Sequence, residues 1–237
     1  MQRAKLRLLA ISLSAFTVIA GMAAYFTSGD QTTNSFEGAS LQIKVEEPNW
    51  KNNPVIVPEQ VIDKDPYIDN TNDTSAYVFM KVTVPAKEVI VEQASADADK
   101  GKYSNTALIP LFRFINSSGS YISDQFSTAQ EINNGWYLMP EYPKEKRNSA
   151  NDVSSYTYLY AYVGDNSGNT MAVLKPSQKT AAPLFNKVIF CNAREDDELP
   201  GSQLNIQIDV FGIQTDFLKS SDETETEAEK VWRYLKK

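Results

Sequence analysis

The stretch Gln203-Leu204-Asn205-Ile206-Gln207-Ile208-Asp209-Val210 decides the fold class, because its apolar and polar residues alternate along its whole length. A period of two is typical of a β-strand that turns one face to a core and the other outward. The same alternation recurs at 41–46, 77–84 and 156–163. Shorter segments with strand composition are 88–92, 109–115, 136–139 and 184–191. The chain is therefore predicted to be all-β.

Turn sequences separate the predicted strands. They are Ser117-Ser118-Gly119, Asn133-Asn134-Gly135, the residues 164–168 and Pro200-Gly201. Short strands with such turns between them are typical of an antiparallel sandwich. Three polar segments, 94–106, 141–155 and 170–183, are predicted to be long loops. The charged, proline-bounded stretch 140–147 at the start of the second is expected to be exposed. None has the composition of an interdomain linker, so one β-sandwich domain is expected over 25–219.

The composition excludes several classes of function. The chain has 237 residues and a net charge of −7, with one cysteine and no histidine. Without histidine there can be no Ser-His-Asp triad, Cys-His pair or HExxH zinc site, and no enzyme activity or cofactor is expected. The acidic balance argues against a nucleic-acid partner. Cys191 has no partner for an internal disulfide and is interpreted as a small buried apolar residue.

The amino terminus is predicted to be a secretory signal peptide over residues 1–24. Arg3, Lys5 and Arg7 precede an apolar run, and small residues at its end place cleavage after Ala23 or Ala24. Loss of three positive charges would take the net charge from −7 to −10. The alternative is an uncleaved membrane anchor. The prediction is therefore a secreted protein that meets a membrane only through the uncleaved signal.

The carboxyl terminus, residues 220–237, is predicted to be a short amphipathic helix. Ser220-Ser221-Asp222-Glu223 contains an S-x-x-E capping box, and basic residues close the helix. Val231, Trp232 and Leu235 fall on one face. This face is expected to dock on the sandwich, with binding of a partner as the alternative.

Two groups of side chains are candidate sites. Asp63, Asp65, Asp69 and Asp73 crowd one segment and offer carboxylates to calcium, although their spacing matches no EF-hand and turn chemistry explains them as well. Tyr156, Tyr158, Tyr160 and Tyr162 lie on one face of a predicted strand. That face is either a contact surface, for sugar rings or another subunit, or a face covered by another sheet or loop.

Four stretches carry a resemblance to a known family. They are Ala24-Tyr25-Phe26-Thr27 with Asn34-Ser35-Phe36-Glu37-Gly38; Glu47-Pro48-Asn49-Trp50; Lys64-Asp65-Pro66-Tyr67-Ile68-Asp69-Asn70-Thr71 before Ala76-Tyr77-Val78; and Ile213-Gln214-Thr215-Asp216-Phe217 with Trp232. Together they resemble the camelysin/TasA-like proteins of Gram-positive bacteria, which are substrates of a dedicated signal peptidase of the SipW type. The likeness covers residues 24–84 and the end of the chain, not the middle, and Gly38 comes one residue earlier than in the family.

The resemblance implies a jelly-roll-like sandwich and a subunit of biofilm-matrix or cell-surface fibres. Such subunits polymerise by β-strand donation, either with themselves or with a related minor fibre protein. The donor would be residues 26–38, with Phe26, Thr27, Asn34 and Phe36 as assembly residues, unless this segment pairs within its own subunit. The family's metallo-endopeptidase label is not carried over, because the chain has no histidine to hold zinc. The alternative function is a monomeric surface adhesin or carbohydrate-binding module that uses the tyrosine face.

Overall fold

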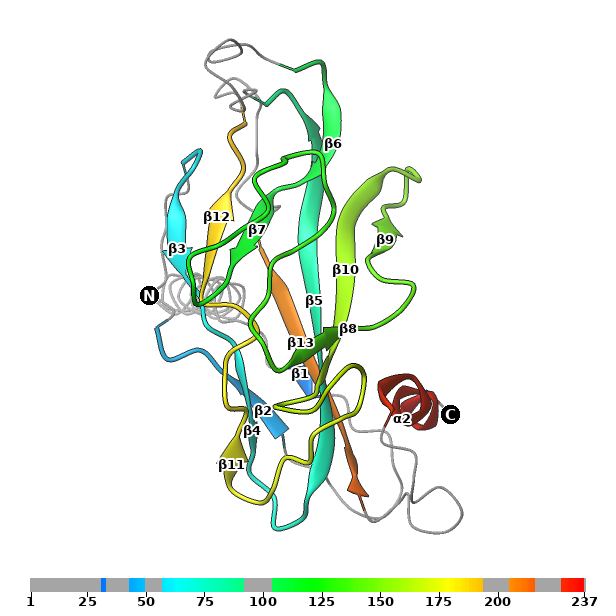
Figure 1. Ribbon diagram of the computed structural model, residues 1–237. Coiled ribbons are helices and arrows are strands. Elements are labelled where there is room, and N and C mark those ends of the chain that lie inside the picture. The colour runs from blue at the N-terminus through cyan, green and yellow to red at the C-terminus, as the bar shows by residue number, and fades with distance from the viewer. Residues whose placement is uncertain are drawn as a thin grey trace, which may run out of the picture.

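The computed structural model describes residues 31–32, 43–49, 57–91, 104–193, 205–215 and 227–236 (Figure 1). The predicted signal peptide, its cleavage residues Ala23 and Ala24, and the capping sequence 220–223 lie outside these ranges. So do the expected assembly residues Phe26, Thr27, Asn34 and Phe36. Within the described part of the chain, no helix is long and apolar enough to cross a bilayer.

The largest sheet has seven strands, with the long strand β5 at its centre (Figure 1). Its path is β1-β13-β5-β10-β8, while β6 pairs with the far end of β5 and β9 pairs with β10. The strands are β1 (Gln31–Thr32), β5 (Ala76–Val89), β6 (Ala107–Pro110), β8 (Trp136–Leu138), β9 (Lys144–Arg147), β10 (Val153–Tyr162) and β13 (Gln207–Gln214). All pairs in this sheet are antiparallel except β1·β13, which is parallel.

Two three-stranded sheets form a second layer opposite the large sheet. One has the order β11-β4-β2 and the other β3-β12-β7. Their strands are β2 (Ile43–Glu46), β3 (Val61–Asp63), β4 (Tyr67–Asn70), β7 (Phe112–Ile115), β11 (Gln178–Lys179) and β12 (Lys187–Phe190). Side chains from both small sheets share one buried cluster with β5, β10 and β13. The predicted all-β, antiparallel architecture with one short carboxyl-terminal helix is confirmed.

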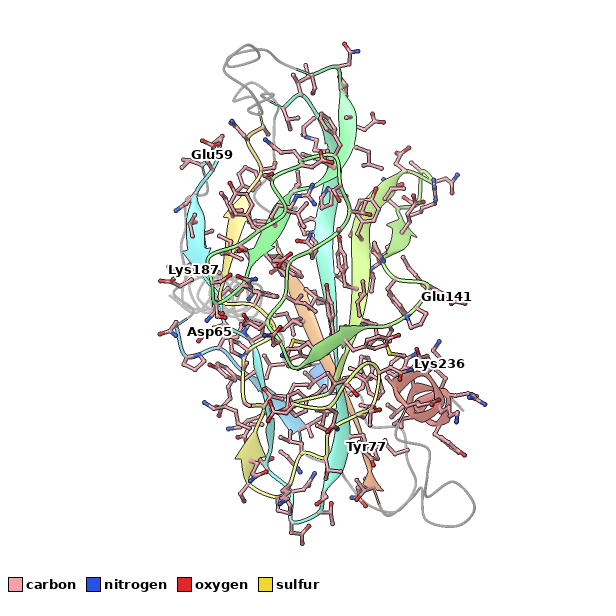
Figure 2. All side chains as sticks on the ribbon, viewed as in Figure 1. Glu59, Asp65, Tyr77, Glu141, Lys187 and Lys236 are labelled. Atoms are coloured by element: carbon pink, nitrogen blue, oxygen red, sulfur yellow. The ribbon has the colours of Figure 1, made fainter. Side chains whose placement is uncertain are left out.

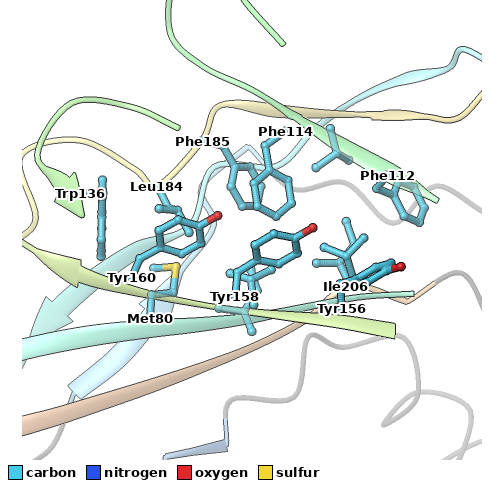
Figure 3. Close-up of a cluster of buried hydrophobic side chains, with 14 of the residues drawn as sticks. Met80, Phe112, Phe114, Trp136, Tyr156, Tyr158, Tyr160, Leu184, Phe185 and Ile206 are labelled. Atoms are coloured by element: carbon cyan, nitrogen blue, oxygen red, sulfur yellow. The ribbon is translucent and has the colours of Figure 1, made fainter. Parts of the chain in front are cut away.

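The alternating residues of β5 and β13 form the centre of this cluster, as their pattern predicts. Val78, Met80, Val82 and Val84 are fully buried, and Ile208 and Val210 lie beside them. From the opposite layer, the Phe114 ring stacks on Phe185 at a centroid distance of 4.1 Å (Figure 3). Burial of such large rings removes much apolar surface from water and is the main stabilising contribution here. Cys191 is also in the cluster and 5% exposed, so its predicted burial is confirmed.

Helix α2 (Ala228–Leu235) covers the other face of the large sheet. Val231 is fully buried, and the Trp232 ring lies 5.0 Å from Phe79 and 5.4 Å from Phe211. The predicted docking of the apolar stripe is therefore confirmed. The helix begins later than residue 220, because Glu227 is extended and Ala228 N donates to Asn169 O at 2.8 Å.

Several strand predictions need correction. The strand predicted at 203–210 is β13 at Gln207–Gln214, and the segment predicted at 88–92 is in part the end of β5, which ends at Val89. The segment 109–115 is not one strand: Pro110 ends β6, Leu111 N donates to Pro85 O, and the chain then enters β7 in the opposite layer. The stretch 140–147 is exposed as predicted, but its second half is β9 rather than loop. Turn chemistry was one explanation of the aspartate-rich segment, but much of it is the strand β4, because residues 67–70 pair with β2 on one side and β11 on the other.

Candidate functional site at the β13 edge

The edge of β13 that faces away from β5 is the feature most relevant to function. β13 pairs with β5 along all of its eight residues, whereas on its other side the described residues of β1 pair with Asp209 and Val210. The register places Gln31 opposite Asp209 and Thr32 opposite Val210, with the strands parallel. A sheet edge presents backbone N–H and C=O groups that another extended segment can pair with. Residues 31–32 belong to segment 26–38, so part of the expected donor lies on an edge of its own chain.

A buried carboxylate lies in the middle of this edge. The Asp209 side chain is 4% exposed and its Oδ2 is 2.7 Å from Lys81 Nζ on β5. Gln207 Nε2 donates to the other oxygen at 3.0 Å. A buried carboxylate is costly unless it is paired and hydrogen-bonded. These two contacts neutralise Asp209, so the edge offers backbone groups without an unpaired charge.

Helix α2 supports the same strand from the outer face. The Trp232 ring lies edge-on to Phe211 of β13. Glu229 fixes the helix, because its carboxylate accepts hydrogen bonds from Tyr137 Oη at 2.9 Å and from Asn169 Nδ2 at 2.6 Å. The outer face of β13 at Phe211 is thereby covered, which leaves the edge as its open side within the described residues.

The opposite end of the large sheet carries an exposed and highly charged strand, β9. All four residues of β9 are exposed, and three of them are basic. Arg147 Nη2 lies 2.6 Å from Glu145 Oε2, and Lys144 Nζ lies 3.2 Å from Oε2 of Glu141, which precedes β9 (Figure 2). Charged side chains on an edge strand discourage pairing with another chain. The two ends of the sheet are therefore not equivalent.

The tyrosine face of β10 is buried. Tyr156, Tyr158, Tyr160 and Tyr162 are 8%, 0%, 1% and 7% exposed and pack against the second layer (Figure 3). Of the two alternatives, the covered face is correct, and an exposed surface for sugars or subunits is not. The reason is that the loop before β8 lies over these rings: Tyr158 Oη donates to Thr128 O at 2.6 Å. The alternative function as a carbohydrate-binding module loses the residues on which it depended.

Burial of the tyrosines predicts loss of stability in alkali. Burial raises the pKa of Tyr158 to about 12 and that of Tyr160 well above its ordinary value. Because the unfolded phenols ionise near pH 10, stability should be constant below that pH and fall as the pH rises further. Tyr158 alone should cost about 2–3 kcal/mol at pH 12. Denaturant unfolding at several pH values, with tyrosinate absorbance, measures this; an unfolding free energy that is flat from pH 9 to about 12 would contradict it.

The structure separates the calcium candidates. Asp63 lies on β3 and is 3.4 Å from Lys187 Nζ, whereas Asp69 lies on β4 and is 3.4 Å from Lys44 Nζ. Asp65 (Figure 2) is buried, and its two oxygens accept hydrogen bonds from Asn49 N and Asn49 Nδ2. Asp73 follows β4 in a turn. Among the described residues no three acidic or cysteine side chains come together to hold a metal ion.

Comparison with known proteins adds no relative: no protein-family model, curated protein or solved structure matches this chain. The features of the β13 edge that the sequence did not reveal are the Lys81–Asp209 pair and the parallel contact with β1. In the sequence, the Lys81–Asp209 pair is indicated only by a lysine within the apolar run 76–84 and an aspartate within the run 204–210. Their opposition depends on the register between β5 and β13, which no local pattern specifies.

Proposed function

We propose that the protein is a secreted structural subunit of extracellular or cell-surface fibres, which polymerises when the amino-terminal segment 26–38 of one copy adds to the β13 edge of the next. The observation that carries the proposal is the parallel pairing of β1 with β13. In this assembly a neighbour's segment takes the place that residues 31–32 hold here. A head-to-tail contact of this kind does not close on itself and gives an open filament.

Several features support the proposal. The donor segment belongs to the stretches that resemble the camelysin/TasA-like family. The β13 edge has a neutralised centre, and the other end of the sheet carries the charged strand β9. We further propose that the sandwich is jelly-roll-like, that the role is structural rather than catalytic, and that a dedicated signal peptidase releases the chain. Its fibre partner would be a second copy or a related minor fibre protein.

Electron microscopy of the secreted protein, with mass spectrometry of its amino terminus, tests this function. We expect filaments and an amino terminus near residue 24. Deletion of Phe26–Gly38 should abolish the filaments and leave a folded monomer, because the donated strand is gone. Filaments that persist unchanged after the deletion would refute strand donation.

A matched pair of proline variants shows which edge is used. Thr32→Pro removes a backbone N–H from the donor and should prevent filaments. Lys146→Pro makes the same change in β9, at the other end of the sheet, and should leave them intact. Equal loss of filaments in both variants would contradict the assignment of the edge.

A further inference from the structure

The sheet β3-β12-β7 ends at β7, and this second edge is closed by a side chain. Phe112 O and Phe114 N lie on the side of β7 away from β12, since Leu111 O and Ile115 O accept from Cys191 N and Asn186 N on the other side. Phe114 N donates to Gln130 Oε1 at 2.9 Å, and Gln130 Nε2 donates to Phe112 O at 3.1 Å.

The carboxamide of Gln130 therefore does what a residue of a parallel strand would do. In a parallel ladder one residue donates to a carbonyl and accepts from the N–H two positions further along the neighbouring strand. Gln130 reproduces this spacing with a side chain instead of a backbone. Parallel pairing also occurs elsewhere in this fold, because β1 pairs parallel with β13.

Gln130 belongs to a strap, residues 121–130, which has no regular secondary structure. Side chains tie the strap down at three further points. Tyr158 Oη donates to Thr128 O, the buried Arg113 donates through Nη2 to Asp124 O at 3.2 Å, and Asn192 N donates to Gln125 Oε1 at 3.0 Å. Among the described contacts, the Gln130 carboxamide alone covers the free backbone groups of β7.

We infer that the strap is a strand surrogate that keeps the β7 edge closed to a second copy of this chain. The edge carries an aligned donor and acceptor, Phe114 N and Phe112 O, which is what the backbone of an extended segment needs for pairing. With β7 closed, this edge does not compete with β13 for the added segment. The identity of the added segment rests on the proposed function, but closure of β7 does not.

The test compares three variants of the full chain. Gln130→Met keeps the length of the side chain and removes both bonds to β7. Gln130→Met/Tyr158→Phe also frees Thr128. Gln125→Met is the matched control, because it makes the same change on the same strap, where the carboxamide oxygen accepts from Asn192 N and not from the β7 backbone.

Hydrogen exchange at the Phe114 amide and sedimentation velocity are measured for each. We expect exchange at Phe114 to rise by about 100-fold in both Gln130 variants and to stay unchanged in Gln125→Met. The double variant should also associate further than the wild type and the control do, as additional concentration-dependent oligomers or as laterally paired filaments. If it fails to fold, Gln130→Met alone is judged by the same two measurements.

Two results would overturn the inference. Protection of Phe114 that survives Gln130→Met would show that the carboxamide does not close the edge. A deprotected Phe114 with an association state equal to that of the wild type would show that the open edge docks nothing. Failure of the proposed function is seen separately, as a wild-type chain that never forms filaments.

Discussion

Replacing Lys64 with methionine should lower the free energy of unfolding by about 3–5 kcal/mol, one of the largest effects expected from a single substitution in this chain. Lys64 Nζ lies 2.7 Å from Glu47 Oε1, and the two side chains are only 3% and 5% exposed. Methionine fills the same volume but leaves the Glu47 carboxylate buried without its cation. Such an unpaired charge costs far more than the pair contributes when intact. Denaturant unfolding at neutral pH measures the loss.

Two control variants make this measurement decisive. Lys187→Met removes the lysine of an exposed pair with Asp63, where the side chains are 50% and 55% exposed, and should cost less than about 1 kcal/mol. Lys64→Met/Glu47→Leu removes both charges and should be more stable than Lys64→Met alone. A loss for Lys64→Met no larger than that for Lys187→Met would contradict the role given to the buried pair.

The Lys64–Glu47 pair also explains two of the sequence motifs. Glu47-Pro48-Asn49-Trp50 and Lys64-Asp65-Pro66 are far apart in the sequence, yet Glu47 contacts Lys64 and Asn49 donates twice to Asp65. An ion pair and two hydrogen bonds therefore join the two stretches and connect the end of β2 to the segment just before β4. The sequence presented Asp65 as a calcium candidate, because an acidic cluster looks alike whether its partner is a metal ion or an amide.

The strands that could be predicted are those with a clean alternation. β5 and β10 lie where the pattern places them, whereas β13 begins at Gln207 and runs on to Gln214, past the alternating stretch 203–210. The buried residues Ile208 and Val210 of β13 and those of β5 are the predicted ones. The break at Leu111 and the strand character of β4 could not be predicted, because both depend on pairing with distant segments. The start of the helix could not be predicted either, because contacts of Glu227 and Ala228 with Thr170 and Asn169 fix its first turn.

The tyrosine face shows a different limit of the pattern. Alternation at 156–163 indicates two faces but not which one is covered, and here both are. The tyrosines pack on the second layer, while Leu159 and Ala161 on the other face lie in the cluster with α2. Which faces of β10 are covered depends on where helix α2 and the strap lie. The sequence of β10 itself does not show their positions.

The candidate site was predictable only in part. The sequence located the expected donor at 26–38 and the strand β13, but not that they meet, nor that they are parallel. A contact between residues so far apart in the chain leaves no local periodicity. The sequence of β9 predicts a loop, because it is charged and follows two prolines. Its strand character depends on pairing with β10, which no local pattern shows.

Cross-linking between copies tests the central claim, donation of the amino-terminal segment to the β13 edge of another copy. Thr32 lies opposite Val210 in the β1·β13 register, so cysteines at these positions should be close enough to join. Thr32→Cys is placed in one chain and Val210→Cys in another, and Cys191→Ser removes the native thiol from both. A third chain carries both new cysteines and reports pairing within one subunit.

The two single-cysteine chains are denatured together, refolded as a mixture and oxidised in air, and the products are separated without reductant. Donation between subunits predicts a covalent dimer in the mixture and covalent polymers from the double-cysteine chain. A mixture that stays free of dimer, while the double-cysteine chain closes its bond internally as a monomer, would show that the segment pairs only within its own subunit and would contradict the account.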